Sequence, residues 1–461
     1  MTDNDFTFGI STLDKLLKPV LEPPSTIVIA GHPGSGKTTF ASTICYANAL
    51  NSKKCLFVSQ QEDKQKLYRN MKRLGMDFYA LESKGLVKHL SFPISSAVEE
   101  IINEISSLVA SQDFRVVVID SVNPLLNAVE GDHAKRAWLQ NYFYNLPKTI
   151  NGVCILVAEL PFGSKSIDLG SIEFVADAVL ILKHGIKSNL LVRKLEIRKS
   201  RSSPISVAEI PFSIVEGRGI ELYAPPILEE VAREGPEVDV FCTKLRNIIK
   251  HLHKGMTVYI SYPPDARPLI YIPMFIGIAV LNDLKIHILS YLYPPDVIKD
   301  LIRKSFSQTG ISREVVDKII QDYIKIRSIN PFTYSTDELA IRELLMIPND
   351  ADIVAFHGIE IFATRNREEY IRSLYNELNY LRNMGKLIIR IGSIANKEIY
   401  DINSMLSDVV IRHDVEQIDG EYRYKMYVWR RGEEPHIIKQ EELDSCLEEL
   451  VDLIKRKLIG G

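Results

Sequence analysis

A glycine-rich run near the start of the chain, followed at once by a lysine and two threonines, has the residue types that hold phosphate groups. From its first glycine to its first threonine it fits the pattern G-x-x-x-x-G-K-S/T at every position. In such a run the backbone N–H groups surround a phosphate, the lysine reaches the outer phosphates and the first threonine hydroxyl binds Mg²⁺. The candidate nucleotide-binding residues are Gly31, His32, Pro33, Gly34, Ser35, Gly36, Lys37, Thr38 and Thr39.

The residues on either side of this run predict the strand and the helix that it needs. Residues 25–30 are mostly apolar and β-branched, which is typical of a buried parallel strand, and residues 38–44 can open a helix. The amino end of a helix carries partial positive charge and free N–H groups, which favours an anion. Strand, glycine turn and helix together predict that the chain binds a nucleoside triphosphate.

An acidic residue ends a later apolar strand, where it can serve the same site. Residues 116–119 are all β-branched, and Asp120 follows them. This is the Walker B pattern, in which the carboxylate at the end of the strand meets the Mg²⁺ shell. Thr38 and Asp120 are therefore the candidate metal ligands.

Strands and helices alternate through the first half of the chain. Helical periodicity covers residues 67–74, 97–108 and 134–146, and a further apolar strand covers residues 152–159. Such alternation predicts an α/β fold with a mostly parallel sheet between helices. Three more β-rich segments follow, at residues 177–183, 190–198 and 212–223.

The composition of the 461 residues is that of an ordinary globular protein, with 46% hydrophobic and 25% charged residues. The net charge of −3 lacks the basic excess of a dedicated nucleic-acid binder. The longest apolar run, residues 269–281, contains Pro273 and is too short to span a bilayer. The first residues have no basic or apolar region of the secretory type, so we expect no secretory signal. The five scattered cysteines form no C-x-x-C pair, so we expect reduced thiols, no zinc, no disulfide and a cytoplasmic location without membrane contact.

The order of the motifs in residues 8–224 resembles the KaiC-type ATPases of the RecA/RadA superfamily. The resemblance implies a RecA-like α/β core, ATP and Mg²⁺ as cofactors, and a hexameric ring of identical subunits with ATP bound between neighbours. Besides the P-loop and the Walker B strand, it rests on Gly9-Ile10 with Leu13-Asp14 and Leu16-Leu17, Leu74-Gly75-Met76-Asp77, Glu173-Phe174-Val175-Ala176-Asp177, Lys199-Ser200-Arg201 and Arg218-Gly219-Ile220.

The resemblance also implies roles for individual residues. Asp120 corresponds to the Walker B acid, and Lys199 and Arg201 correspond to a pair that reaches the γ-phosphate of the neighbouring subunit. A cation that crosses an interface stabilises transition-state charge and couples hydrolysis to assembly. Without the family, the same two residues are interpreted as caps of a solvated strand end.

One position departs from the family pattern. The family has two adjacent glutamates after the second strand, here predicted at residues 54–59, where this chain has Gln61 and Glu62. Glutamine orients a water molecule but does not take its proton. We therefore expect Glu62 to be the base, or hydrolysis to be slow. In the alternative, Gln61 is only a polar residue at a strand end.

The second half of the chain repeats the pattern of the first. After a Pro- and Glu-rich linker at residues 224–236, an offset of 231 residues pairs Pro33 with Pro264 and Ser59 with Ser290. We interpret this repeat as an internal duplication that produced two tandem RecA-like domains.

The chemistry of the first half is absent from its repeat. The phosphate lysine becomes Pro268, the metal-binding threonine becomes Leu269, and the Walker B acid becomes His357, for which a structural use is expected. Proline and bulky side chains remove the N–H groups that hold phosphate. We therefore expect an active domain at residues 1–228 and a degenerate domain at residues 229–461.

The leading hypothesis is an oligomeric ATPase that drives or switches a partner-binding assembly, its protein partner unknown. One alternative is a regulatory module that holds ATP with little turnover, which Gln61 favours. Another is a recombinase-like DNA-repair factor that binds single-stranded DNA through loops facing the channel of a ring. The candidate loops, residues 123–136 and residues 161–173 with Lys165, have few aromatic residues and little positive charge, which weakens that interpretation.

Overall fold

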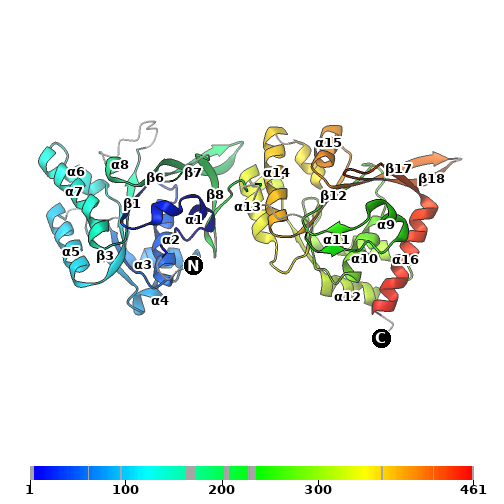
Figure 1. Cartoon of the computed structure of the whole chain (residues 1–461), viewed down its shortest axis with the longest axis horizontal. Helices are drawn as coiled ribbons and strands as arrows, with labels where there is room; N and C mark the ends of the chain where they lie inside the picture. Colours follow the sequence, from blue (N-terminus) through cyan, green and yellow to red (C-terminus); the bar gives the residue numbers. More distant parts are fainter. Residues whose placement is uncertain are drawn as a thin grey trace. The chain divides into compact units, whose positions relative to one another are not determined.

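In the computed structural model of the chain there are two compact units, Met1–Ala224 and Pro225–Gly461 (Figure 1). Each unit has one large sheet between helices. The structure describes residues 5–60, 62–93, 96–161, 172–201, 203, 207–226, 228, 235–364, 367–418 and 420–458. No helix in these ranges combines the length and the apolar character that crossing a membrane requires.

Nine strands form the sheet of the first unit: β1 (Ser25–Gly31), β2 (Lys54–Ser59), β3 (Val87–Ser91), β4 (Phe114–Asp120), β5 (Val153–Glu159), β6 (Ala178–Lys187), β7 (Leu190–Ser200), β8 (Glu209–Val215) and β9 (Gly219–Leu222). Their order is β3-β2-β4-β5-β1-β6-β7-β8-β9. The strands from β3 to β6 run parallel, and the last three are added antiparallel at one side. The predicted α/β fold with a mostly parallel sheet is confirmed.

The helices of the first unit are α1 (Ser11–Leu16), α2 (Lys37–Leu50), α3 (Lys64–Arg73), α4 (Phe78–Ser83), α5 (Val98–Ser111), α6 (Asn123–Ala128), α7 (His133–Thr149) and α8 (Ile172–Val175), with a 3₁₀ turn η1 (Lys18–Leu21). Side chains of β1 alternate between the two faces of the sheet. Ile27 and Ile29 join the apolar cluster that α2 covers, whereas Val28 and Ala30 join the cluster that α5 and α7 cover. Strand β3 was not predicted, because it lies at the edge of the sheet and only its Val87 is buried.

Eight strands form the main sheet of the second unit: β12 (Thr257–Tyr262), β13 (Ile286–Ser290), β14 (Ile324–Ser328), β15 (Ile353–His357), β16 (Leu387–Ser393), β17 (Val409–Ile418), β18 (Glu421–Arg430) and β19 (His436–Lys439). Two short strands, β10 (Glu237–Val238) and β11 (Leu252–His253), pair separately. The main order, β14-β13-β15-β16-β12-β17-β18-β19, matches the first eight positions of the other sheet one for one. Pairing also changes from parallel to antiparallel at the corresponding place, between β17 and β18. The chain therefore carries two RecA-like sheets in tandem.

The helices of the second unit are α9 (Thr243–Ile249), α10 (Tyr271–Leu281), α11 (Pro295–Phe306), α12 (Arg313–Tyr323), α13 (Thr336–Met346), α14 (Arg367–Asn383), α15 (Lys397–Met405) and α16 (Gln440–Leu458), with 3₁₀ turns η3 (Pro331–Thr333) and η4 (Ile359–Thr364). The last helix, α16, buries Leu450 and Ile454 against its own unit. It approaches α10 closely, because a Cβ added to Gly277 would lie 3.0 Å from Cδ1 of Ile454.

The expectation of reduced cysteines without a disulfide was wrong for two of the five. Cys242, which precedes α9, and Cys446, in α16, form a disulfide bond across 204 residues of sequence. Their spacing carries no motif, and only the tertiary fold brings them together. The other cysteines, Cys45, Cys55 and Cys154, are free and buried.

One face of the second sheet holds a buried polar network around Arg390 of β16. The Arg390 guanidinium donates from Nε to Oδ1 of Asn403 at 2.8 Å and from Nη2 to the hydroxyl of Tyr370 at 3.3 Å, and its Nη1 lies 3.7 Å from Oε2 of Glu377. Burial, followed by the charge of Glu377, raises the pKa of Glu343 well above its usual value. Burial also raises the pKa of Glu377, although the charge of Arg390 opposes that shift. Both shifts favour a proton on the carboxyl pair, and we expect Glu343 to carry it.

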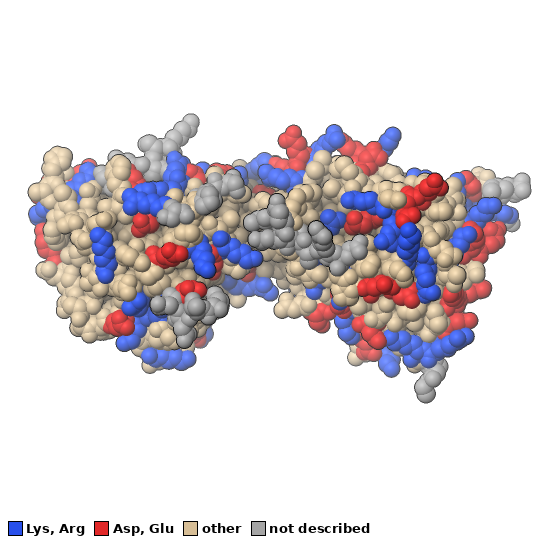
Figure 2. Space-filling view, viewed as in Figure 1, with Lys and Arg blue, Asp and Glu red and all other residues tan. Residues whose placement is uncertain are grey.

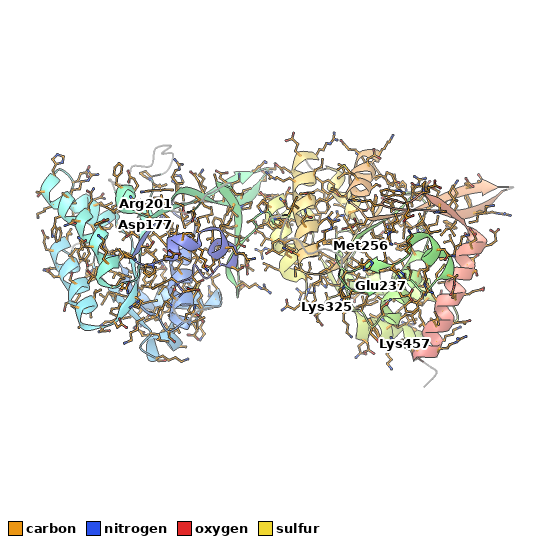
Figure 3. All side chains as sticks on the ribbon, in the orientation of Figure 1. Asp177, Arg201, Glu237, Met256, Lys325 and Lys457 are labelled. Carbon is orange, nitrogen blue, oxygen red and sulfur yellow. A yellow bond between two sulfur atoms is a disulfide. The ribbon has the colours of Figure 1, made fainter. Side chains whose placement is uncertain are left out.

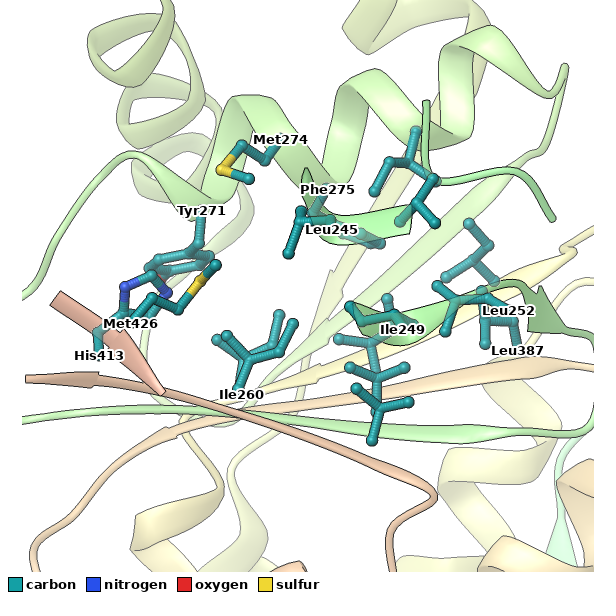
Figure 4. Close-up of a pocket in the computed structure, with 17 residues that line it drawn as sticks. Leu245, Ile249, Leu252, Ile260, Tyr271, Met274, Phe275, Leu387, His413 and Met426 are labelled. Atoms are coloured by element: carbon teal, nitrogen blue, oxygen red, sulfur yellow. The ribbon is translucent and has the colours of Figure 1, made fainter. Parts of the chain in front are cut away.

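The opposite face of the second sheet encloses an apolar cavity of about 60 Å³ (Figure 4). Its walls come from α9, α10 and the strands, with Leu245, Ile260 and Met274 among them. His413 lines one side, and burial lowers its pKa to about 4, so that the ring is neutral. A small cavity with such walls stays dry and is part of the core.

We expect loss of the disulfide to destabilise the second unit, because a closed loop of 204 residues removes about 5 kcal/mol of chain entropy from the unfolded state. Chemical denaturation of the Cys242→Ser chain, and of the wild type with and without reductant, measures this effect. The unfolding of the first unit, whose described cysteines are free, is the internal control. An unchanged midpoint for the second unit would contradict the expectation.

We expect the second unit to lose stability as the pH rises above neutral, because Glu343 releases on unfolding a proton that the folded state retains. A carboxyl with a raised folded pKa stabilises fully below its unfolded value, near 4.5, and loses that contribution as the pH rises through the folded value. The loss approaches about 1.4 kcal/mol per pH unit.

Denaturant midpoints between about pH 7 and about pH 9 test this expectation. Glu343→Gln, which keeps the group neutral, should flatten the dependence. Asp296→Asn is the matched control, because the Asp296 side chain is 90% exposed. Parallel profiles for the wild type and Glu343→Gln would show that Glu343 is already ionised in the folded protein.

Candidate functional site

The glycine run joins β1 to α2 in the backbone shape that a phosphate-binding loop needs. Gly34 and Gly36 have φ angles of 78° and 102°, which lie in the left-handed region that favours glycine. Gly31 is required by space, because a Cβ there would lie 2.5 Å from the carbonyl oxygen of Leu182. The first turn of α2 then presents its unpaired N–H groups at the end of the loop, where they suit an anion.

Lys37 begins α2, and its side chain turns back over the loop. Its Nζ donates to the carbonyl oxygen of His32 at 3.0 Å. Burial lowers the pKa of Lys37, and the charges of Glu159 and Asp120 oppose that shift. The lysine is thus a partly desolvated cation held by a carbonyl oxygen, which a phosphate oxygen can replace.

Asp120 ends β4 close to the start of α2. Its carboxylate accepts a hydrogen bond from the hydroxyl of Thr38, yet burial raises the pKa of Asp120 to about 6. Lys37 favours ionisation of this carboxyl but does not offset its burial. A divalent cation beside Asp120 would stabilise its ionised form. A carboxylate next to a hydroxyl oxygen is also a ligand set that suits a hard divalent cation. The hydroxyl oxygen of Thr38 and the carboxylate of Asp120 therefore fit Mg²⁺ as ligands.

Glu62 is held beside this group by the end of β2. Ser59 pairs with Asp120 in the parallel ladder, and its hydroxyl accepts from the N–H of Glu62 at 3.1 Å and donates to the Glu62 carbonyl at 3.0 Å. Oε1 of Glu62 accepts from Nδ2 of Asn70 at 3.4 Å. The Glu62 charge is one of those that raise the pKa of Asp120, after burial. Gln61, expected to orient the attacking water, lies outside the described residues.

Another carboxylate, absent from the sequence prediction, reaches the same place. Glu159 ends β5 and pairs with Gly31 in the ladder. Asn123 binds its backbone on both sides, because the N–H of Glu159 donates to Oδ1 of Asn123 at 2.7 Å and Nδ2 of Asn123 donates to the Glu159 carbonyl at 3.0 Å. The Glu159 charge acts on both Lys37 and Asp120. The available signal was its position, since Glu159, like Asp120, is the last residue of an apolar parallel strand.

Lys199 and Arg201 lie toward the other end of the sheet from the glycine run. Ile27, near the start of β1, pairs with Ala178, and Ala178 pairs with Ser200. The two cations therefore flank the amino half of β1, whereas the glycine run follows its carboxyl end. Four residues of strand, roughly 13 Å, separate the two levels. Neither cation is brought to the P-loop of its own unit.

Both cations bind carbonyl groups at the end of α8. Nζ of Lys199 donates to the carbonyl oxygen of Glu173 at 2.7 Å, and Nη2 of Arg201 donates to that of Phe174 at 2.9 Å. Nη1 of Arg201 lies 3.4 Å from Oδ1 of Asp177, and Figure 3 shows the two residues side by side. These contacts agree with caps of a strand end, and action on a neighbouring subunit stays a prediction.

The second unit fills the corresponding place with its own side chains. Its strand β12 leads into residues 263–269, where Arg267 lies against the rings of Tyr262 and Tyr293 and donates to the Tyr293 hydroxyl at 3.0 Å. Nη2 of Arg267 also lies 3.9 Å from Oε1 of Glu360. Aromatic rings and an internally paired arginine leave this segment without the open N–H groups of a phosphate loop.

His357 stands where the Walker B acid stands in the first unit. Its Nδ1 shares a hydrogen bond of 3.2 Å with the hydroxyl of Ser290. Burial lowers the pKa of His357 to about 4. His357 is thus a neutral, buried residue with a structural partner, as the sequence suggests.

The described residues of the two segments predicted to contact nucleic acid show no concentration of positive charge. Residues 123–136 form α6 and the start of α7, and residues 162–171, including Lys165, lie outside the described residues. Figure 2 shows Lys and Arg interspersed with Asp and Glu over the visible face of each unit. Binding of nucleic acid stays a prediction.

Comparison with known proteins matches the first unit. A family model described as "ATPase: KaiC" covers residues 6–227. The "Circadian clock oscillator protein KaiC" of Nostoc sp. is 26% identical over 231 residues, which are 50% of this chain and 41% of that protein. The protein of the same name from Picosynechococcus sp. is 26% identical over 210 residues, 45% of this chain and 41% of its own length. That of Prochlorococcus marinus is 24% identical over 249 residues, 54% and 49% respectively.

The match spans less than half the length of each of these relatives. It nevertheless contains every residue of the site described above, from the glycine run to the edge with Lys199 and Arg201. Sheet order, loop geometry and family match agree with one another. Residues 6–227 therefore form a KaiC-like ATPase domain of the RecA superfamily.

Proposed function

We propose that the chain hydrolyses ATP as a Mg²⁺-dependent oligomer, with one active and one degenerate RecA-like domain. The domains correspond to residues 1–228 and residues 229–461. The observation that carries this proposal is the meeting of Lys37, Asp120 and Glu62 at the carboxyl edge of the first sheet. The second sheet keeps the same strand order and has a different residue at each corresponding place.

In this proposal the site residues of the first unit have distinct roles. Backbone N–H groups within residues 31–39, among which Pro33 has none, and the ammonium of Lys37 bind the phosphates. Thr38 and Asp120 hold Mg²⁺, which neutralises phosphate charge when bound. Glu62 takes the proton of the attacking water, because it is the carboxylate that β2 places next to Asp120.

We propose an oligomer because Lys199 and Arg201 lie too far from the P-loop of their own unit to bind a phosphate there. Lys199 and Arg201 lie at the far end of β1, so a phosphate within their reach belongs to a second copy of the chain. A hexameric ring with ATP between neighbours satisfies this geometry. The second unit then supports the assembly or binds a protein partner, in a cytoplasmic setting.

A second candidate is a module that holds ATP as a switch and turns it over slowly. The observation in its favour is Gln61, which stands where the family has its first glutamate. Glutamine accepts no proton, so catalysis then depends on Glu62 alone. The two candidates share one binding site and differ in turnover.

We expect ATP turnover to rise with protein concentration through the range in which the chain assembles, and to vanish in Lys37→Ala. Turnover is measured beside oligomer mass, with Lys54→Ala as the control, because Lys54 is exposed at the start of β2. Calorimetric titration of Lys37→Ala with MgATP should show no remaining site. Stoichiometric binding by that variant would place a nucleotide in the second unit and contradict its degeneracy.

We expect Glu62→Gln to lower turnover by about 10²-fold or more, the usual contribution of a general base, and to leave ATP affinity nearly unchanged. Gln61→Glu, which restores the family pair, should raise turnover. Glu104→Gln, on the exposed face of α5, is the control. A Glu62→Gln chain that hydrolyses ATP at the wild-type rate would mean that the base lies elsewhere.

A further inference from the structure

Both units hold an arginine in the same set of contacts. In the first unit, the N–H of Arg201 donates to the carbonyl of Asp177 at 2.8 Å, and its Nη2 donates to the carbonyl of Phe174 at 2.9 Å. In the second, the N–H of Arg431 donates to the carbonyl of Asp408 at 2.9 Å, and its Nη2 donates to the carbonyl of Met405 at 3.1 Å. The guanidinium lies 3.4 Å and 3.9 Å from the respective carboxylates. In the second unit Nη2 of Arg382 also donates to Oδ2 of Asp408 at 3.1 Å, so the two sets agree in their carbonyl contacts and differ at the carboxylate.

The aspartate of each set ties the arginine to the central strand. Oδ2 of Asp177 accepts from the N–H of Thr26 in β1 at 2.9 Å, and Oδ2 of Asp408 accepts from the N–H of Thr257 in β12 at 2.9 Å. Each arginine therefore closes a chain of hydrogen bonds from the central strand, through the aspartate, to the end of the antiparallel strand. We call this arrangement the strand-end lock.

The strand-end lock does not depend on a nucleotide. The second unit keeps it, although Arg267 and its aromatic neighbours fill the place of the phosphate loop there. A set of contacts present in both units, with and without a P-loop, is explained by its role in the fold. Retention of Arg201 thus needs no contact with a neighbouring phosphate.

Lys199, unlike Arg201, has no charged counterpart at the corresponding position of the second unit. In the ladders Val179 pairs with Lys199, and the corresponding Val410 pairs with Trp429. Trp429 packs against the apolar cluster beneath β17 and carries no charge. The lysine is thus found only in the unit that has a phosphate site, and its place is taken by a packing residue in the other.

Lys199 and Arg201 also differ in the number of contacts that each side chain must break before it can reach a neighbouring subunit. Among the described residues, Lys199 has one hydrogen bond from its ammonium, to the carbonyl of Glu173. Arg201 would have to leave a carbonyl and a carboxylate together, and the strand-end lock with them. The lysine is free to turn outward at a smaller cost than the arginine.

We propose a division of labour within the Lys-x-Arg pair: Lys199 supplies the positive charge to the phosphate of the neighbouring subunit, and Arg201 is the strand-end lock that both units share. This inference rests on the proposed function, because it concerns ATP bound between copies of the chain. It predicts that turnover follows the charge at position 199, whereas the stability of the strand end follows Arg201.

The test compares Lys199→Met, Lys199→Arg, Arg201→Ala and Arg431→Ala in the full chain. Lys199→Met removes the charge at similar length and should lower turnover by about 10²-fold or more, and Lys199→Arg should restore most of it. Mixing Lys199→Met with Lys37→Ala should recover activity, because some interfaces then pair an intact P-loop with an intact lysine. Hydrogen exchange at Thr26 should stay as in the wild type.

Arg201→Ala should speed hydrogen exchange at Thr26. Arg431→Ala is the matched control in a unit without a P-loop, and it should speed exchange at Thr257 to a smaller extent, because Arg382 also binds Asp408 there. Turnover of Arg201→Ala should fall only as far as its assembled fraction falls, measured by oligomer mass. A loss of about 10²-fold in fully assembled Arg201→Ala, or wild-type turnover in Lys199→Met, would overturn the division of labour and leave the ATPase standing. Absence of Lys37-dependent turnover in the wild type would overturn both.

Discussion

The parallel ladder around β1 is the constraint on which the rest of the first unit depends. All seven residues of β1 are buried, and the strand is hydrogen-bonded to β5 on one side and β6 on the other. Parallel strands end at one edge, so the ladder brings Gly31, Asp120 and Glu159 to the same end of the sheet. The same ladder sends Lys199 and Arg201 toward the opposite end. One sheet thereby separates the glycine run and its carboxylates from Lys199 and Arg201.

Burial gives the phosphate end its electrostatic character. Desolvation lowers the pKa of Lys37 and raises that of Asp120, so it disfavours the charged form of both groups. A phosphate would favour the charged lysine and a divalent cation would favour the charged carboxylate. The site is therefore complementary to both ligands together.

The second unit shows which parts of the architecture are independent of that chemistry. It keeps the order of the strands, the change from parallel to antiparallel pairing and the strand-end lock. It lacks the glycine loop and the acid at the end of the fourth strand position. Its stability draws on other devices, namely the bond between Cys242 and Cys446 and the buried network of Arg390. A sheet of this kind is a scaffold that holds together with or without a ligand.

The sequence by itself determined the features that depend on neighbouring residues. The P-loop, the Walker B strand and the central parallel strands were predicted because a turn, a helix start and a buried strand each leave a local pattern. The repeat was visible for the same reason, since an offset of 231 residues keeps Pro33 in line with Pro264.

The tertiary structure alone decided which distant residues meet. Glu159 joins Lys37 only through the register of β5 on β1, and Cys242 meets Cys446 only through the packing of α16. The match of Arg201 with Arg431 was hidden by an irregularity in β7, which shifts their offset by one residue from that of the aspartates they bind. Contacts of this kind depend on how strands align across the sheet, and spacing along the chain carries no record of that alignment.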